Sequence, residues 1–400
     1  MDVDIYKDCV YYIKEVKSDT YKYNIFYVNK DIPLNEKIIK EMEKYTIVEF
    51  ADKFNQRVDN LSVLHPEKGR KGLKKIIFGY RFNQPVDNLP SKIKEISFGT
   101  HFNQSVYNLP SSIKILHFDI YNKPINNLPS SIKILTFDRE FNQPVDNLPP
   151  ELEELYLGRD FNLPVNKLPS KIKELTFGYY FNQPIDNLPY GLKKLVFEGQ
   201  FNQTVDNLPP EIQELTFGPS FNQQVDNLPS KIKKLTFDWN FNQPVNNLPP
   251  DIEELTFGTC FNQPVDNLPS KIRVIKFGDE FNQSVDYLPS NIHSITFGDS
   301  FNQPIDNLPS GLLELTLGDE FNQSVDYLPS NIHSITFGDS FNQPVDNFPS
   351  GLLELTLGEG FNQPLYVLPK GLQRLTISKN YMKTLNYVPV SVKIIFSSRF

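Results

Sequence analysis

Histidine and cysteine, which often carry nucleophilic, acid–base or metal chemistry, are few in this 400-residue chain, which contains five His and two Cys. Cys9 and Cys260 are too far apart to match a metal-binding or redox motif, so we expect both to be reduced and structural. His293 and His333 occupy the same place in two nearly identical stretches, residues 281–320 and 321–360. Catalysis needs a unique constellation of groups, and duplicated residues do not supply one. We therefore predict no catalytic residue, no metal and no cofactor.

Carboxylates recur at regular spacing, but lysines accompany them. Glu174, Glu214 and Glu254 are evenly spaced, and Lys194 and Lys234 fall midway between them. A nearby cation favours the charged form of a carboxylate and lowers its pKa, which makes the row a poor general base. This pattern also argues against an enzyme.

Composition and charge narrow the classes of partner. The 32 Phe and 32 Pro against a single Trp indicate one motif copied many times. The formal charge of −8 argues against nucleic acid or an anionic membrane surface as the main partner. No apolar run is long enough to span a membrane, and residues 1–30 lack the apolar stretch of a secretory signal. We expect a cytoplasmic protein.

The chain repeats with a period of about 20 residues, and a short fixed period of this kind is typical of a solenoid. Four copies with irregular spacing come first and begin at Phe54, Phe82, Phe102 and Tyr121, and a degraded copy begins at Tyr381. The regular copies begin with Phe-Asn at Phe141, Phe161, Phe181, Phe201, Phe221, Phe241, Phe261, Phe281, Phe301, Phe321, Phe341 and Phe361.

Each copy holds one strand and a return path. Pro184 and Pro189 exclude a helix, because proline lacks an amide donor and restricts the residue before it. Residues 172–177 alternate in the manner of a strand and end at a glycine. One such unit cannot bury its own apolar face, so the copies must stack. The sequence predicts a mainly β fold, a parallel β-solenoid of 20-residue coils.

The apolar positions of the repeat predict its interior. In one coil the inward residues are Ile172, Leu175, Phe177, Phe181, Ile185 and Leu188. Asn182 follows a core Phe, and a buried amide without hydrogen bonds costs about 1–3 kcal/mol. We therefore predict buried, hydrogen-bonded amides that form a ladder from coil to coil. Its members are Asn142, Asn162, Asn182, Asn202, Asn222, Asn242 and Asn262.

The motif Phe-Asn-Gln-Pro-Val/Ile-x-Asn-Leu-Pro followed by Leu-x-x-Leu-x-Phe-Gly resembles the FNIP repeat family over residues 54–390. The resemblance implies a leucine-rich-repeat-like fold and a source among amoebae or the large viruses that infect them. Some relatives carry an N-terminal F-box that links them to ubiquitin ligases. Residues 1–44 show no Leu-Pro-led F-box helix pattern, so we expect no F-box.

The ends of the chain depart from the repeat. We predict an N-terminal cap over residues 1–44, with strand character in residues 21–28 and a short helix in residues 35–44. The solenoid then covers residues 45–390, and residues 391–400 form a last capping strand. In that strand we expect Ile394 and Phe396 to point outward.

The outer sheet face carries threonine at the fifth strand position, as in Thr176 and Thr236. High β-propensity on an exposed face accounts for such a row. The alternative is that the Thr ladder binds carbohydrate or ice. Lysine and glutamate at the third position argue against that alternative.

The dipeptide before each Phe is the most variable part of the repeat and should line one rim of the solenoid. We predict a protein-binding site there, because exposed aromatic and charged side chains suit recognition. The residues are Tyr179, Tyr180, Trp239, Asp279, Glu280, Asp319 and Glu320. Tyr180 and Trp239 are three coils apart, about 14 Å by strand spacing. The function favoured is a non-catalytic protein–protein interaction scaffold or adaptor.

Overall fold

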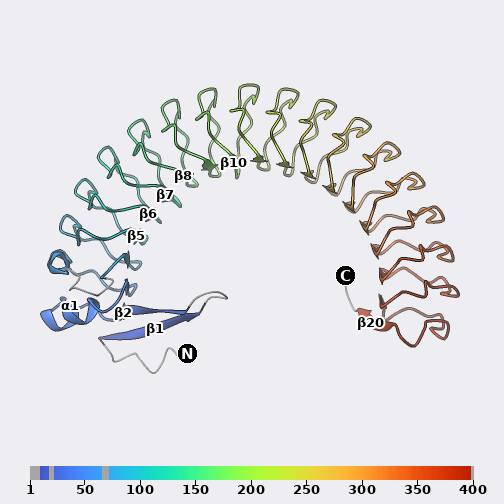
Figure 1. Cartoon of the computed structure of the whole chain (residues 1–400), viewed down its shortest axis with the longest axis horizontal. Coiled ribbons are helices and arrows are strands. Elements are labelled where there is room, and N and C mark those ends of the chain that lie inside the picture. The colour runs from blue at the N-terminus through green and yellow to red at the C-terminus, as the bar shows by residue number, and fades with distance from the viewer. Residues whose placement is uncertain (1–9, 18–21, 65–71, 398–400) are drawn as a thin grey trace. The chain divides into compact units, whose positions relative to one another are not determined.

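The computed structural model describes residues 10–17, 22–64 and 72–397, in two compact units, residues 1–197 and 198–400. Cys9 and His65 lie outside the described residues. Within each unit the strands of successive coils stack side by side in chain order (Figure 1). The mainly β class and the solenoid of 20-residue coils are confirmed.

The first unit begins with an antiparallel hairpin, β1 (Tyr11–Lys17) and β2 (Lys22–Val28), followed by α1 (Glu36–Met42). The strand and helix predicted in these regions match β2 and α1, whereas β1 was not predicted. Strand β2 then pairs in parallel with β3 (Ile47–Phe50), and a 3₁₀ turn covers Asp59–Val63. The remaining strands are β4 (Lys75–Ile77), β5 (Glu95–Phe98), β6 (Ile115–Phe118), β7 (Ile134–Phe137), β8 (Glu154–Leu157), β9 (Glu174–Phe177) and β10 (Lys194–Phe197).

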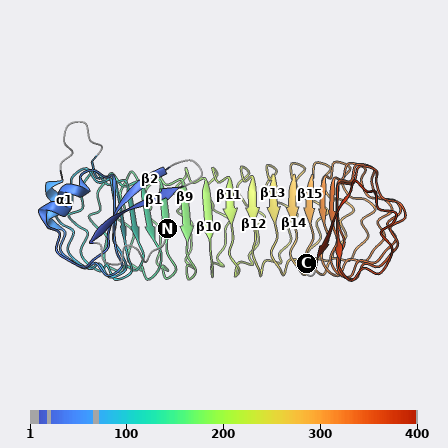
Figure 2. The same cartoon turned by 90° about the horizontal axis from the view of Figure 1, so that it is seen from below.

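The second unit contains only strands and turns among its described residues. Its strands are β11 (Glu214–Thr216), β12 (Lys234–Thr236), β13 (Glu254–Thr256), β14 (Val274–Lys276), β15 (Ser294–Thr296), β16 (Glu314–Thr316), β17 (Ser334–Thr336), β18 (Glu354–Thr356), β19 (Arg374–Ser378) and β20 (Lys393–Ser397). In Figure 2 the arrows of β11 to β15 lie side by side and point the same way. Their parallel register joins equivalent residues, as in Leu235 and Leu255.

The core follows the predicted positions. Ile172, Leu175, Phe177 and Phe181 have no exposed surface, and Ile185 is 4% exposed. The Phe177 and Phe181 rings stack within one coil at 3.8 Å between centroids. The ring of Phe161, one coil earlier, lies 6.0 Å from that of Phe181. Each ring therefore completes the packing of its neighbours along the stack.

The glycine after the strand allows close approach of the coils. Six consecutive coils, from Gly258 to Gly358, carry it. A Cβ on Gly278 would collide with the backbone carbonyl of Gly258. Because the colliding atoms are backbone, no side-chain rotation relieves the contact. The spacing of these coils thus depends on glycine.

The orientation predicted for the last strand is wrong. Strand β20 pairs with β19 at a spacing one residue shorter than the repeat, so Ile394 lies opposite Leu375 and Phe396 opposite Ile377. A shift of one residue turns every side chain to the other face. By register Ile394 and Phe396 therefore align with core rows and Ile395 with the outer row, but in this last strand Ile394 is only half-buried and Phe396 is 51% exposed. The division into cap, solenoid and last strand stays a prediction.

We expect Phe181→Ala to destabilise the first unit by about 3–5 kcal/mol, because it removes a fully buried ring from the stack. Amide hydrogen exchange should accelerate first in the coils on either side, since each coil depends on its neighbours. Tyr190→Ser, at a side chain 71% exposed, is the matched control and should change stability by less than about 0.5 kcal/mol. Equal effects of both substitutions would contradict the assignment of Phe181 to the core.

Gly278→Ala should cost about 1–3 kcal/mol through overpacking against the Gly258 backbone. Gly371→Ala is the control, because a Cβ there lies 3.7 Å or more from its neighbours. Urea denaturation followed by circular dichroism compares the two variants. A midpoint for Gly278→Ala as high as that for Gly371→Ala would show that the close approach is not needed.

Candidate interaction surfaces

The predicted asparagine ladder is present as a chain of hydrogen bonds between coils. The Asn262 backbone N–H donates to Oδ1 of Asn242 at 3.0 Å, and Gln263 Nε2 donates to the same oxygen at 3.0 Å. Asn262 Oδ1 in turn accepts from the Asn282 N–H and from Gln283 Nε2. The same backbone-to-side-chain bond joins Asn162 to Asn142, Asn182 to Asn162, Asn222 to Asn202 and Asn242 to Asn222.

The predicted burial of the ladder is wrong. Asn142 and Asn222 are exposed, and Asn162, Asn182 and Asn262 are half-buried. The preceding Phe turns into the core, and the Asn side chain lies along the corner between coils. There its oxygen satisfies an amide N–H that the turn leaves without a backbone partner. The ladder thus holds the turn in place at the edge of the core.

The predicted aromatic rim residues are exposed, but they belong to two units. In the first unit, Tyr179 and Tyr180 are 44% and 38% exposed, and their rings meet edge to face at 5.0 Å. The Arg159 guanidinium lies 5.5 Å from the centre of the Tyr180 ring. In the second unit, Trp239 is 56% exposed, and its backbone N–H donates to the Asp238 carboxylate. The spacing expected between Tyr180 and Trp239 stays a prediction.

The acidic rim residues Asp279, Glu280, Asp319 and Glu320 are also exposed. Their backbone continues the coil-to-coil bonding, since the Glu280 N–H donates to the Thr259 carbonyl and the Glu320 N–H donates to the Asp299 carbonyl. In the part of the chain that the structure describes, no Lys or Arg nitrogen lies within ion-pair distance of these four carboxylates. Their charges thus face solvent.

Cys260, on the same rim, is free and half-buried. Its thiol lies 3.8 Å from a Glu280 carboxylate oxygen. Burial, followed by the charge of Glu280, raises the pKa of the thiol. A raised pKa disfavours the nucleophilic thiolate. Cys260 therefore shows no sign of an activated cysteine.

The sheet face does not present bare threonine. Thr216, Thr236 and Thr256 align in register but are only half-exposed. Beside them, Lys234 Nζ pairs with Glu254 at 2.9 Å, and both side chains are exposed. Lys276 interrupts the threonine row in the next coil. The threonine row is therefore accompanied by exposed charged side chains and is interrupted by one.

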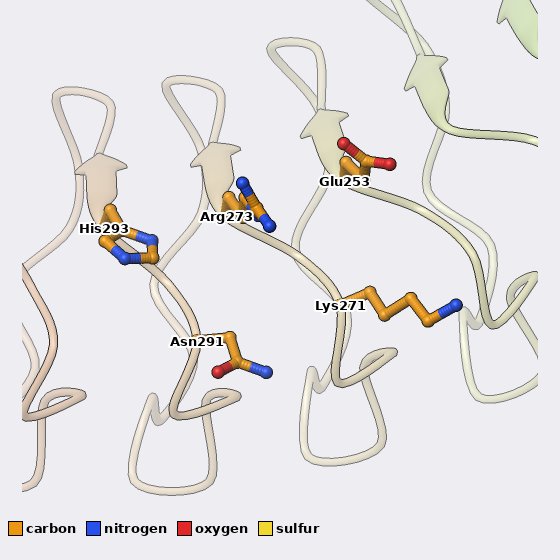
Figure 3. Close-up of a pocket in the computed structure, with 5 residues that line it drawn as sticks. All are labelled: Glu253, Lys271, Arg273, Asn291 and His293. Carbon is orange, nitrogen blue, oxygen red and sulfur yellow. The ribbon is translucent and has the colours of Figure 1, made fainter.

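A shallow hollow of about 200 Å³ lies on the approach to β13, β14 and β15 (Figure 3). It is lined by Glu253, Lys271, Arg273, Asn291 and His293. Lys271 pairs with Asp251 at 2.6 Å, and this contact raises the pKa of Lys271 and lowers that of Asp251. The ion pair favours the charged ammonium of Lys271, which is therefore poorly suited to accept a proton.

The described residues offer no cluster of three His, Cys, Asp or Glu side chains suited to a metal ion. Nor does any helix in that part of the chain have the length and apolar content needed to cross a membrane. His117 Nε2 lies 3.3 Å from the Asp138 carboxylate. Among the described residues, no Ser, Thr or Cys side chain is hydrogen-bonded to this pair.

The family model that matches the sequence is the FNIP Repeat, with eleven matches, some of them overlapping, between residues 70 and 360. The chain belongs to the FNIP repeat family. Its fold is similar to that of CroV588, described as a circular LRR protein, with 31% identity and a TM-score of 0.76. The similarity covers 96% of this chain and 70% of that one.

This FNIP repeat protein also shares its fold with a chain of the Toll–Spatzle complex from Drosophila. The TM-score is 0.55 at 11% identity, covering 89% of this chain and 50% of that one. None of the curated proteins compared with the chain matches it. The leucine-rich-repeat-like architecture implied by the repeat motif is therefore confirmed.

We expect Asn262→Ala to destabilise the second unit by about 1–3 kcal/mol, since it removes the acceptor of two donors. Asn262→Asp is the matched control, because a carboxylate oxygen still accepts from the Asn282 N–H and from Gln283. The loss of unfolding free energy in Asn262→Asp should be clearly smaller than in Asn262→Ala. Chemical denaturation of both variants checks this, and an equal loss would show that the oxygen is not what matters.

Proposed function

We propose that this FNIP repeat protein is a non-catalytic protein-interaction scaffold or adaptor. Leucine-rich-repeat-like solenoids typically serve as such scaffolds, with a repetitive core that presents an extended surface. The observation that carries the proposal is the contrast within each coil. Positions such as Phe181 are fully buried and nearly constant, whereas the rim dipeptides vary along the chain and include exposed side chains such as Tyr179 and Trp239.

The chemistry of the rim supports a protein partner. In the first unit, Tyr179 and Tyr180 offer large, rigid aromatic surfaces at low entropic cost. In the second unit, Trp239 does the same. Exposed carboxylates at Asp279, Glu280, Asp319 and Glu320 add charge that steers encounter and repels nucleic acid. We place the protein in the cytoplasm as part of this proposal.

The alternative of a carbohydrate- or ice-binding solenoid has less support. Such a surface needs threonine hydroxyl groups that are open and free of neighbouring long side chains. Here Lys234 and Glu254 pair beside half-exposed threonines, and Lys276 replaces one of them. The rim is the better candidate for the binding surface.

The rim is tested with the triple variant Tyr179→Ser, Tyr180→Ser, Trp239→Ser. Folding should be nearly unchanged, because exposed substitutions usually shift stability by less than about 0.5 kcal/mol. Binding should weaken by at least about 2 kcal/mol if these residues are hot spots. The measurement is quantitative capture from amoebal extract on immobilised wild type, triple variant and Tyr190→Ser.

Partner proteins should be retained by wild type and by Tyr190→Ser, whose exposed tyrosine lies off the rim. The triple variant should lose them. Recovery of the same proteins in the same amounts on all three would rule out these rim residues as the binding surface.

A further inference from the structure

A second hydrogen-bonded ladder runs along the corner that follows the asparagine ladder. Many coils carry Asp-Asn at this corner, and the Asn side chain donates to the Asp carboxylate of the coil before it. In the second unit these bonds, between 2.9 and 3.1 Å, join Asn227 to Asp206, Asn247 to Asp226, Asn307 to Asp286 and Asn347 to Asp326. The bond from Asn347, followed by one from Ser324, lowers the pKa of Asp326.

Two coils break this second ladder with tyrosine. Tyr287 and Tyr327 replace the donating Asn and are 72% and 73% exposed. The Asp residues that would accept from an Asn at these positions are Asp266 and Asp306. Within the described ranges neither Asp accepts a hydrogen bond or pairs with a cation, and both are exposed. In each of two places an exposed ring thus replaces the Asn that would bond the carboxylate of the coil before it.

The last coils show how an aromatic side chain is placed at this position. Tyr387 also replaces the Asn, and Tyr366 stands in the place of the Asp one coil earlier. The two rings meet edge to face with centroids 5.2 Å apart. A ring at this position therefore reaches the Asp position of the preceding coil, as the Asn side chain does. Tyr287 has this relation to Asp266, and Tyr327 has it to Asp306.

We propose that Tyr287 with Asp266, and Tyr327 with Asp306, form two equivalent sites for arginine side chains of an extended, basic partner segment. The carboxylate accepts charge-assisted hydrogen bonds from the guanidinium, and the ring face attracts its positive charge. Both contacts occur separately within this chain. Arg139 Nη2 pairs with Asp119 at 3.0 Å, and the Arg159 guanidinium lies over the Tyr180 ring.

The spacing of the two sites defines the partner segment. At the level of the Phe stack, the coils of Phe281, Phe301 and Phe321 are 6.0 and 6.1 Å apart. Tyr287 and Tyr327 are two coils apart, and the matching two steps of the Phe stack total about 12 Å, which an extended chain spans in about four residues. Arginines four residues apart point to the same side of such a chain, so one segment engages both sites. Two linked contacts bind more tightly than either alone.

This surface is separate from the rim, and the proposal holds even if the rim residues bind nothing. The test uses the full chain and an amidated 12-residue peptide of Gly and Ser with Arg at every fourth position. Binding is measured by fluorescence anisotropy at low salt. A peptide with citrulline in place of arginine, which keeps the shape and removes the charge, should bind at least about tenfold more weakly.

The decisive variant restores the ladder. Tyr287→Asn with Tyr327→Asn should weaken binding of the arginine peptide at least about tenfold, because each ring is lost and each free carboxylate regains its Asn partner. Its thermal midpoint should equal or exceed that of wild type, which separates lost binding from lost folding. Wild-type affinity in this variant would overturn the proposal.

A charge-matched pair of variants tests the carboxylates. Asp266→Asn with Asp306→Asn should weaken binding about tenfold, whereas Asp286→Asn with Asp326→Asn should change it less than about twofold. Both double variants remove two negative charges from the same corner, but only the second pair already has Asn partners. Equal losses would mean that net charge alone attracts the peptide, and equal binding of arginine and citrulline peptides would overturn the site itself.

Discussion

No coil of this solenoid can enclose its own apolar side chains, and the rest of the structure depends on this constraint. A single coil supplies one short strand and a return path, which leaves rings such as Phe181 open on two sides until the neighbouring coils cover them. The glycine after the strand brings adjacent backbones close enough for this contact, as at Gly278. A stack of several coils, and not the individual coil, is therefore what is stable.

Because of this constraint, the free-energy cost of a substitution depends on whether the residue lies in the core stack, at its edge or at the exposed corner. Loss of a buried ring costs about 3–5 kcal/mol, whereas a typical hydrogen bond contributes only about 0.5–1.5 kcal/mol. Asn262 stands between these limits, because its oxygen serves two donors at the edge of the core. The exposed Asp-Asn corner lies at the low end. We therefore expect substitutions there, unlike those in the Phe stack, to leave the fold in place.

The sequence predicted what depends on the period and missed what depends on local register. The inward rows of Leu175 and Phe181 repeat many times, so every copy carries the same information. Ile394 and Phe396 belong to one irregular coil, where a spacing one residue short of the repeat reversed the expected orientation. The burial of Asn182 was wrong because a polar side chain adjoining a core Phe can turn along the corner between coils. The sequence shows that Tyr287 stands where other coils have Asn. Only the hydrogen bonds of the neighbouring coils show that this Asn is the donor to the Asp of the coil before it.

The two tyrosines illustrate how a repeat protein gains a binding surface at little cost to its fold. Replacing Asn by Tyr at residue 287 removes one solvent-exposed hydrogen bond, while the core row of Phe281 and the bond between Asn282 and Asn262 persist. The freed Asp266 is then exposed and has no ion pair among the described residues, and the ring that replaces its Asn donor is exposed as well. Because residues 281–320 and 321–360 are nearly identical, the second site stands in the same register two coils on. Duplication in a stacked array thus fixes the distance between two sites as well as their number, and that distance gives a multivalent surface its selectivity.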